Sequence, residues 1–194
     1  AEARFSGNLK QIQIDQFALY TPDRSMVLEA PLTIRHLENP AQRTIKADIR
    51  NLQITSAGLK QLSEWTSNDK ISILPYLQAI GRLEATGDLS YRSQYLKSHL
   101  NLHTDLGSMT LSGSFAKGNE IEAEVHTPGF QLGKLTGREE QFGETAFDLS
   151  GKGLLRSGAY PVLSLQGTIG RLSYNHYDYH DITVDVDYRK GGFA

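Results

Sequence analysis

Apolar and polar residues alternate with a period of two along most of the chain. Because successive side chains of a strand point to opposite faces, apolar residues at i, i+2 and i+4 mark one face of a sheet. The clearest stripes are Leu28–Ile34, Ile45–Ile49, Leu83–Tyr91, Leu96–Leu106, Met109–Phe115, Ile121–Val125, Phe147–Leu149, Leu163–Ile169 and Ile182–Tyr188. Within each stripe, the residues that alternate with the apolar ones, on the opposite face, are consistently polar. The pattern therefore predicts roughly a dozen antiparallel strands.

Bulge and turn signals in the sequence interrupt or separate these stripes. The stripe of Ile12 and Ile14 resumes one residue out of phase at Phe17, which predicts a bulge or turn near Asp15–Gln16. Turns are predicted where Gly, Asn and Pro cluster, namely at 117–119, 127–129 and 157–161.

One segment has helical spacing instead. Leu59, Leu62 and Trp65 lie on one face of a helix predicted over about 56–66, with Thr55 or Ser56 as its N-cap. Such a helix either caps the end of an open sheet or serves as a plain crossover connection. Residues 71–80, with an internal proline, fit either a loop or a short helix.

Glycine recurs in the apolar phase of four stripes, at Gly87, Gly113, Gly151 and Gly167. A glycine there removes bulk from the inner face and permits a sharp bend, although glycines in β-rich chains also simply mark turns and bulges. We favour the interpretation that these glycines allow the sheet to curve. The predicted fold is all-β, an elongated curved antiparallel sheet forming an open groove with one short helix. Residues 1–80 contain the helix, and residues 81–194 continue the same sheet.

The composition agrees with a thin sheet and excludes several functions. Apolar residues make up 39%, below the ~45–50% usual for a globular domain. Twenty Lys+Arg residues against 22 Asp+Glu leave no basic field for nucleic acid. The absence of cysteine excludes disulfides and thiolate chemistry, and no apolar run is long enough to span a bilayer. From its first and last residues we expect a piece of a longer protein.

No pattern indicates catalysis, a metal or a cofactor. His176 and His180 are four residues apart, but strand patterns flank them. A solvent-exposed turn is therefore favoured over metal ligation. Glu120, Glu122 and Glu124 alternate along one solvent face, and Glu139–Glu140 lies in a polar loop. General acid–base chemistry needs carboxylates in a shared dry pocket, and no nucleophile or phosphate-loop motif occurs. The sequence therefore predicts a protein that is not an enzyme.

Four runs in the C-terminal half resemble a known family: 129–137 (GFQLGKLTG), 142–153 (FGETAFDLSGKG), 167–174 (GTIGRLSY) and 179–188 (YHDITVDVDY). Over about residues 80–194 the chain is similar to TamB-like translocation and assembly proteins of the AsmA-like superfamily, in their Bacteroidetes form. The resemblance implies a taco-shaped sheet in the periplasm, within a full-length protein anchored in the inner membrane. It also implies phospholipid transport towards the outer membrane and an outer-membrane barrel partner.

The physics of the pattern is compatible with that cargo. A dozen strands about 4.8 Å apart would make a trough of roughly 55 Å, longer than the ~30 Å hydrocarbon layer of a bilayer. We expect phospholipid or another acyl-chain ligand on the inner face. The alternative is a structural or chaperone-like scaffold that assists outer-membrane protein assembly by strand addition. The predicted groove residues are Leu83, Leu89, Leu100, Leu102, Met109, Leu111, Phe115, Phe147, Leu149, Leu163, Leu165, Ile169, Val184 and Val186.

Overall fold

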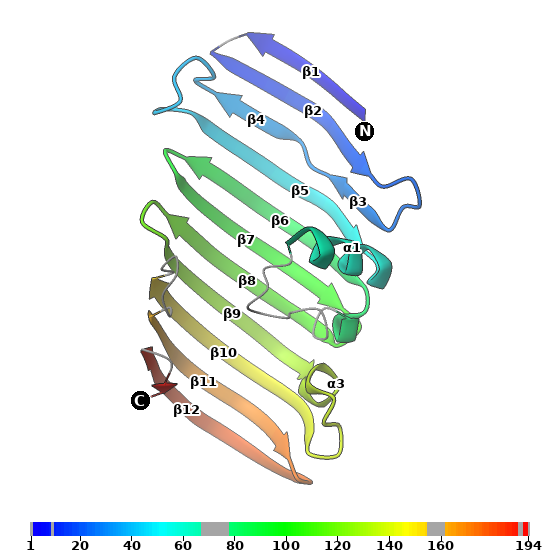
Figure 1. Cartoon of the computed structure of the whole chain (residues 1–194), viewed down its shortest axis with the longest axis vertical. Coiled ribbons are helices and arrows are strands. Elements are labelled where there is room, and N and C mark those ends of the chain that lie inside the picture. The colour runs from blue at the N-terminus through cyan, green and yellow to red at the C-terminus, as the bar shows by residue number, and fades with distance from the viewer. Residues whose placement is uncertain (1, 9, 67–77, 155–161, 190–191, 194) are drawn as a thin grey trace.

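The computed structural model describes residues 2–8, 10–66, 78–154, 162–189 and 192–193. Its strands form one 13-stranded antiparallel sheet (Figure 1). They are β1 (Glu2–Asn8), β2 (Gln11–Tyr20), β3 (Met26–Glu29), β4 (Leu32–Arg35), β5 (Thr44–Ile54), β6 (Leu83–Arg92), β7 (Tyr95–Thr104), β8 (Gly107–Ala116), β9 (Glu120–Gln131), β10 (Phe142–Leu154), β11 (Val162–Tyr174), β12 (Tyr177–Arg189) and β13 (Gly192–Phe193). The predicted all-β fold is confirmed.

The strands follow one another across the sheet in chain order. The one departure is that β3 and β4 share a single position between β2 and β5, end to end. Strand β6 pairs directly with β5, so the segments before and after residue 80 belong to the same sheet. Tight turns link β6 to β7, β7 to β8, β8 to β9 and β11 to β12. In the last of these, Asn175 and His176 both have positive φ, as a two-residue hairpin loop requires.

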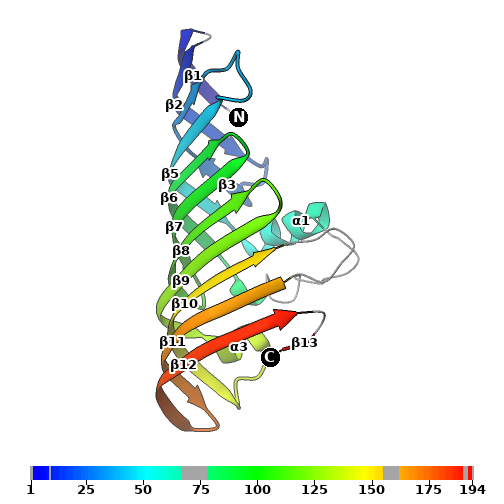
Figure 2. The same ribbon diagram turned by 90° about the vertical axis from the view of Figure 1, so that its left-hand side faces the viewer.

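The sheet bends into a trough. Figure 2 shows the strands curving partway along their length, with α1 on the concave side. The accessible surface is 13015 Å². A compact monomer of 21.5 kDa would expose about 9,200 Å². The chain is therefore an extended, thin-walled structure with little closed interior.

Bulges keep the apolar side chains on one face through this bend. Asp15 lies unpaired between the Arg4–Gln16 and Phe5–Ile14 pairs, which confirms the predicted slip in β2. A register shift also falls between Ile49 and Leu52 of β5, and an extra residue, Gly170, interrupts β11. Each extra residue inverts the alternation. Leu52 therefore returns to the face of Ile49, and Leu172 to the face of Ile169.

Short helices flank the sheet, and residues 78–80, just before β6, are also helical. The predicted helix is confirmed as α1 (Ser56–Thr66), and α3 (Leu132–Thr136) follows β9. Thr55 is the N-cap of α1, because its Oγ1 accepts a hydrogen bond from the Gly58 N–H at 3.3 Å. Gly58 brings the helix close to the sheet: a Cβ there would lie 2.5 Å from the Ser25 carbonyl oxygen and 2.7 Å from Met26 Cγ. Helix α1 is thus fixed on β3 and β5.

Three local predictions are wrong. The Leu28–Ile34 stripe is divided between β3 and β4, because Pro31 between them has no N–H to donate to a neighbouring strand. The Leu96–Leu106 stripe is not one strand, because the Thr104 hydroxyl accepts from the Leu106 N–H and donates to the Gly107 carbonyl, which closes a turn. Residues 127–129 do not end a strand either. They form a bulge inside β9, in which Thr127 Oγ1 donates to the Ser108 carbonyl at 2.7 Å. The turn predicted at 157–161 and most of 71–80 lie outside the described residues.

Candidate functional site

The strand register aligns apolar residues in rows that cross most of the sheet. We call the face carrying these rows the inner face. One row runs Ile12, Ile34, Ile45, Tyr91, Leu96, Phe115, Ile121, Gly153, Leu163 and Tyr188. The next runs Ile14, Leu32, Ala47, Leu89, Ser98, Gly113, Ala123, Gly151, Leu165 and Val186. Ordinary cross-strand neighbours thus form continuous apolar bands.

The rows nearer α1 and α3 continue the same face. One runs Ile49, Gly87, Leu100, Leu111, Val125, Leu149, Gly167 and Val184. Another contains Leu52, Ala85, Leu102 and Met109, then Thr127, Phe147, Ile169 and Ile182 on the far side of the β9 bulge. The last contains Ile54, Leu83, Thr104, Gly107, Phe130, Thr145, Leu172 and Tyr179.

All of the predicted groove residues lie on this inner face. None of them belongs to the fully buried set, since most are half-buried and two are open to solvent. Phe115 is 39% exposed and Leu165 is 38% exposed. Along β7 and β9 the polar residues of the other face are more exposed than the apolar residues beside them, whereas along β8 Ser112 and Ser114 are half-buried beside the exposed Phe115. The inner side chains shield one another because the sheet curves around them. No second sheet is present among the described residues to cover them.

A small closed core lies at the end of the trough that carries the helices. Its buried apolar residues include Ile54, Leu59, Ala85, Leu106 and Phe130, and buried threonines accompany them at Thr104, Thr127 and Thr145. The period-two pattern does not separate this core from the rest of the apolar stripe. The available signal was the helix itself, because an amphipathic helix needs an apolar surface to cover. Helix α1 supplies Leu59 to this core, which is a structural role.

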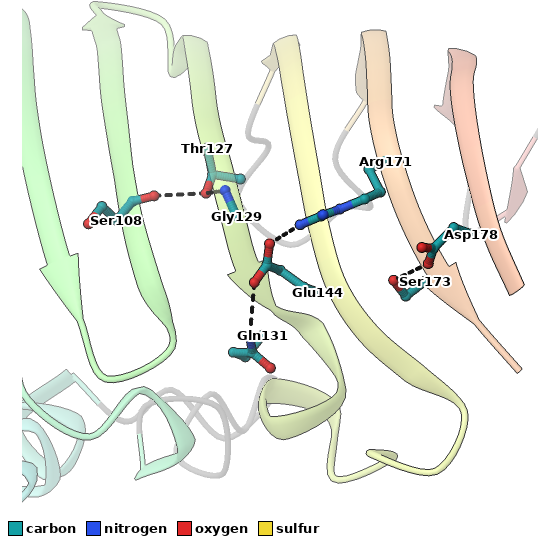
Figure 3. Close-up of polar contacts among 8 residues, drawn as sticks. All are labelled: Ser108, Thr127, Gly129, Gln131, Glu144, Arg171, Ser173 and Asp178. Atoms are coloured by element: carbon teal, nitrogen blue, oxygen red, sulfur yellow. Dashed lines mark hydrogen bonds and ion pairs between the residues drawn. The ribbon is translucent and has the colours of Figure 1, made fainter. Parts of the chain in front are cut away.

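Polar contacts tie β8 to β12 next to this core (Figure 3). Glu144 accepts from Gln131 Nε2 at 3.3 Å and forms an ion pair with Arg171. Ser173 donates to Asp178 at 2.5 Å. The Glu144 and Arg171 side chains are 41% and 40% exposed, so water screens part of their attraction. These contacts therefore link neighbouring strands beside the bulges.

The face opposite the inner face, the outer face, is polar. His99 and His103 are exposed, as predicted, and their Nδ1 atoms contact the hydroxyls of Ser112 and Ser108 at 2.8 and 2.6 Å. Glu120, Glu122 and Glu124 are exposed on this face. An open hollow of about 500 Å³ over β5–β9 is lined by polar residues such as Asn101 and Thr110 together with apolar residues such as Leu52 and Met109.

The described residues contain no cluster of three or more His, Asp or Glu side chains placed to hold a metal ion. His176 lies in the β11–β12 turn and His180 within β12, both exposed. Asp23, in the turn between β2 and β3, has its pKa lowered to about 2, chiefly by a hydrogen bond from Thr21 and also by the backbone and hydroxyl of Ser25. Hydrogen bonding to an exposed turn carboxylate stabilises local structure.

In the part of the chain that the structure describes, no helix has the length and apolarity to cross a membrane. Comparison with protein-family models, curated proteins and solved structures found nothing that matches this chain.

Proposed function

We propose that the inner face binds acyl chains, and that the chain is a non-catalytic segment of a TamB/AsmA-like protein that carries phospholipid across the periplasm. The observation that supports this proposal is the continuity of the apolar rows. From Ile49 in β5 to Val184 in β12, consecutive cross-strand neighbours are apolar residues or glycine. An acyl chain lying across the strands would meet no charged side chain along that row.

The partial exposure of the inner face favours a ligand over a self-filled core. An apolar side chain left in water costs about 25 cal/mol for each Å² of its surface that burial would remove from contact with water. Side chains such as Leu165, 38% exposed, remain in contact with water unless something covers them. A mobile hydrocarbon chain covers such a surface without demanding a specific shape. It can also slide along the rows, which a packed protein core would prevent.

The experiment compares two adjacent residues of β7 that point to opposite faces. Leu100 lies on the inner face and Asn101 on the outer face. We expect native mass spectrometry of the protein, purified from bacteria without detergent, to detect bound phospholipid. Leu100→Asp should weaken binding of a fluorescent phospholipid about tenfold or more, because it places a charge against hydrocarbon. Asn101→Asp should leave binding unchanged. Absence of bound lipid, or equal effects of the two substitutions, would contradict the proposal.

A further inference from the structure

The strand ends that face away from α1 and α3 form one long edge of the trough. We call this edge the open rim and define it as residues 35–46, 90–97 and 114–122, which include the turns from β4 to β5, β6 to β7 and β8 to β9. Figure 1 shows these turns side by side along one side of the sheet, opposite the helices. Each of these strands is paired on both sides, so the open rim lies in the interior of the sheet.

Charge is unevenly distributed along the chain, and the open rim is basic. It contains six Lys or Arg residues against three Asp or Glu residues, although the whole chain has 20 against 22. One of the three acidic residues, Glu122, is already paired with Lys152 of β10. The balanced charge of the whole chain therefore hides a local excess of cations, because the fold brings separate segments together at this edge.

Four of these cations form one group on the outer face. We call this group the basic cluster, which consists of Arg35, Lys46, Arg92 and Lys97. Arg35 and Arg92 both lie across from Thr44, whereas Lys46 and Lys97 both lie across from Ser90. Consecutive members are therefore diagonal neighbours on adjacent strands, roughly 7–8 Å apart. All four side chains are exposed, so the cluster is accessible from solvent.

The basic cluster is not neutralised by its surroundings. Among the described residues, no carboxylate forms an ion pair with Arg35, Lys46 or Arg92, and Lys97 Nζ lies over the Tyr95 ring at 5.4 Å. The nearest carboxylates of the same strands on this face, Asp48 and Asp88, lie one row further from the open rim. Asp48 is itself paired with Arg50. Like charges at diagonal positions repel one another, so an anion lying across the cluster would stabilise it.

Exposed aromatic rings accompany these cations at the open rim. Tyr95 is 38% exposed and Phe115 is 39% exposed, and Lys117 follows Phe115 in the β8–β9 turn. Aromatic rings beside lysine and arginine are typical of surfaces that bind at the interface of a lipid layer, where the rings enter the headgroup region and the cations contact phosphates. A soluble polyanion would use the cations and leave the rings in water. The combination therefore favours a lipid surface.

We propose that the open rim docks edge-on against an anionic phospholipid surface. The basic cluster and Lys117 contact lipid phosphates, and the Tyr95 and Phe115 rings enter the headgroup region. The adjacent row of the inner face, which includes Leu96, then lies next to the lipid layer. Docking uses cations of the outer face and the turns, so it goes beyond the binding of acyl chains on the inner face and is tested separately.

The test is flotation of the protein with vesicles of phosphatidylcholine alone or mixed with phosphatidylglycerol. We expect at least about tenfold tighter binding to the mixed vesicles, weakening as salt screens the exposed charges. The double variant Arg92→Gln/Lys97→Gln should weaken this binding about tenfold. The double variant Lys134→Gln/Arg138→Gln, which makes the same charge change at exposed positions near α3, should have little effect. Tyr95→Ala should weaken binding about threefold.

A second measurement separates docking from the proposed function. Arg92→Gln/Lys97→Gln should bind a fluorescent phospholipid in solution as the unaltered protein does, because neither residue lies on the inner face. Absence of vesicle binding, equal binding to the two kinds of vesicle, or equal effects of the two double variants would overturn the docking surface. A single-stranded oligonucleotide that binds as tightly as the mixed vesicles, with no effect of Tyr95→Ala, would overturn its preference for lipid.

Discussion

Gly87 of β6 lies directly across from Leu100 of β7, in a backbone conformation that a side chain would not tolerate. Its φ is +142°, and a Cβ at this position would collide with the His99 carbonyl oxygen. Gly167 of β11 repeats the arrangement with φ +148° against the Asp148 carbonyl. Both glycines lie in the row that runs from Ile49 to Val184, and they allow neighbouring strands to approach closely as the sheet bends.

Replacing Gly87 by alanine should therefore destabilise the protein markedly. We expect a loss of about 2–3 kcal/mol in the free energy of unfolding, from the positive φ and the backbone clash together. Gly113→Ala is the matched control, because Gly113 lies in the same kind of motif but its Cβ would lie 3.5 Å from the nearest atom. It should change stability by less than about 1 kcal/mol. Urea unfolding of both variants measures the difference, and equal losses would contradict this role of Gly87.

The Thr55 cap should contribute measurably to the anchoring of α1. Thr55 Oγ1 accepts from the Gly58 N–H and donates to the Ser25 carbonyl, both at 3.3 Å. We expect Thr55→Ala to cost about 1 kcal/mol of stability and to speed hydrogen exchange in α1, while Thr55→Ser retains most of both. Denaturation and amide exchange check the two variants. An alanine variant as stable as the serine variant would show that the hydroxyl contributes nothing.

The Arg171–Glu144 and Lys152–Glu122 ion pairs, which link strands β9 to β11, should differ in strength. Glu144 is hydrogen bonded by Gln131 and paired with Arg171, and both ion-pair partners are more than half covered. Lys152 and Glu122 are 75% and 59% exposed. We expect Glu144→Gln to lower the free energy of unfolding by about 1 kcal/mol and Lys152→Gln to change it by less than about 0.5. The ranking is checked by urea unfolding at low salt, and the reverse order would contradict it.

The Asp23 carboxyl should titrate well below its ordinary range. Its folded-state pKa of about 2 lies below the usual 3.8. The stability linked to this group is therefore present above about pH 4 and is lost as the pH falls towards 2. Carboxyl carbon NMR shifts followed against pH should give a midpoint near 2, and Thr21→Val should raise it. A midpoint near 3.8 in the unaltered protein would show that the turn hydrogen bonds do not form in solution.

The sheet and its inner face could be predicted because the alternation of apolar residues determines both. Ile45, Ala47 and Ile49 indicate a strand and its buried side at once, since a shift of one residue would expose all three. The same logic located the Asp15 bulge, where the phase changes between Ile14 and Phe17. The start of α1 could be predicted from Thr55 as the N-cap and from the helical spacing of Leu59, Leu62 and Trp65.

Features that depend on tertiary contacts could not be predicted in this way. Gly113 resembles Gly87 in its local sequence, yet only Gly87 has positive φ, because strand approach is decided by the neighbouring strands. The Thr104 and Thr127 hydroxyls both donate to a backbone carbonyl, but Thr104 stabilises the turn before β8 whereas Thr127 stabilises the bulge within β9. The division between a closed core near α1 and a half-exposed inner face depends on which surface the helix covers, which the period-two pattern does not specify.

Site-specific photocrosslinking tests the central claim most directly. A photoreactive phenylalanine analogue at Leu165 on the inner face is compared with one at Gln166, the adjacent residue of β11 on the outer face. Both positions are exposed, so their access to solvent is matched. After irradiation in bacterial cells, mass spectrometry of the purified protein should detect phospholipid adducts at position 165 and none at 166. Adducts at neither position, or equally at both, would contradict a lipid-binding inner face.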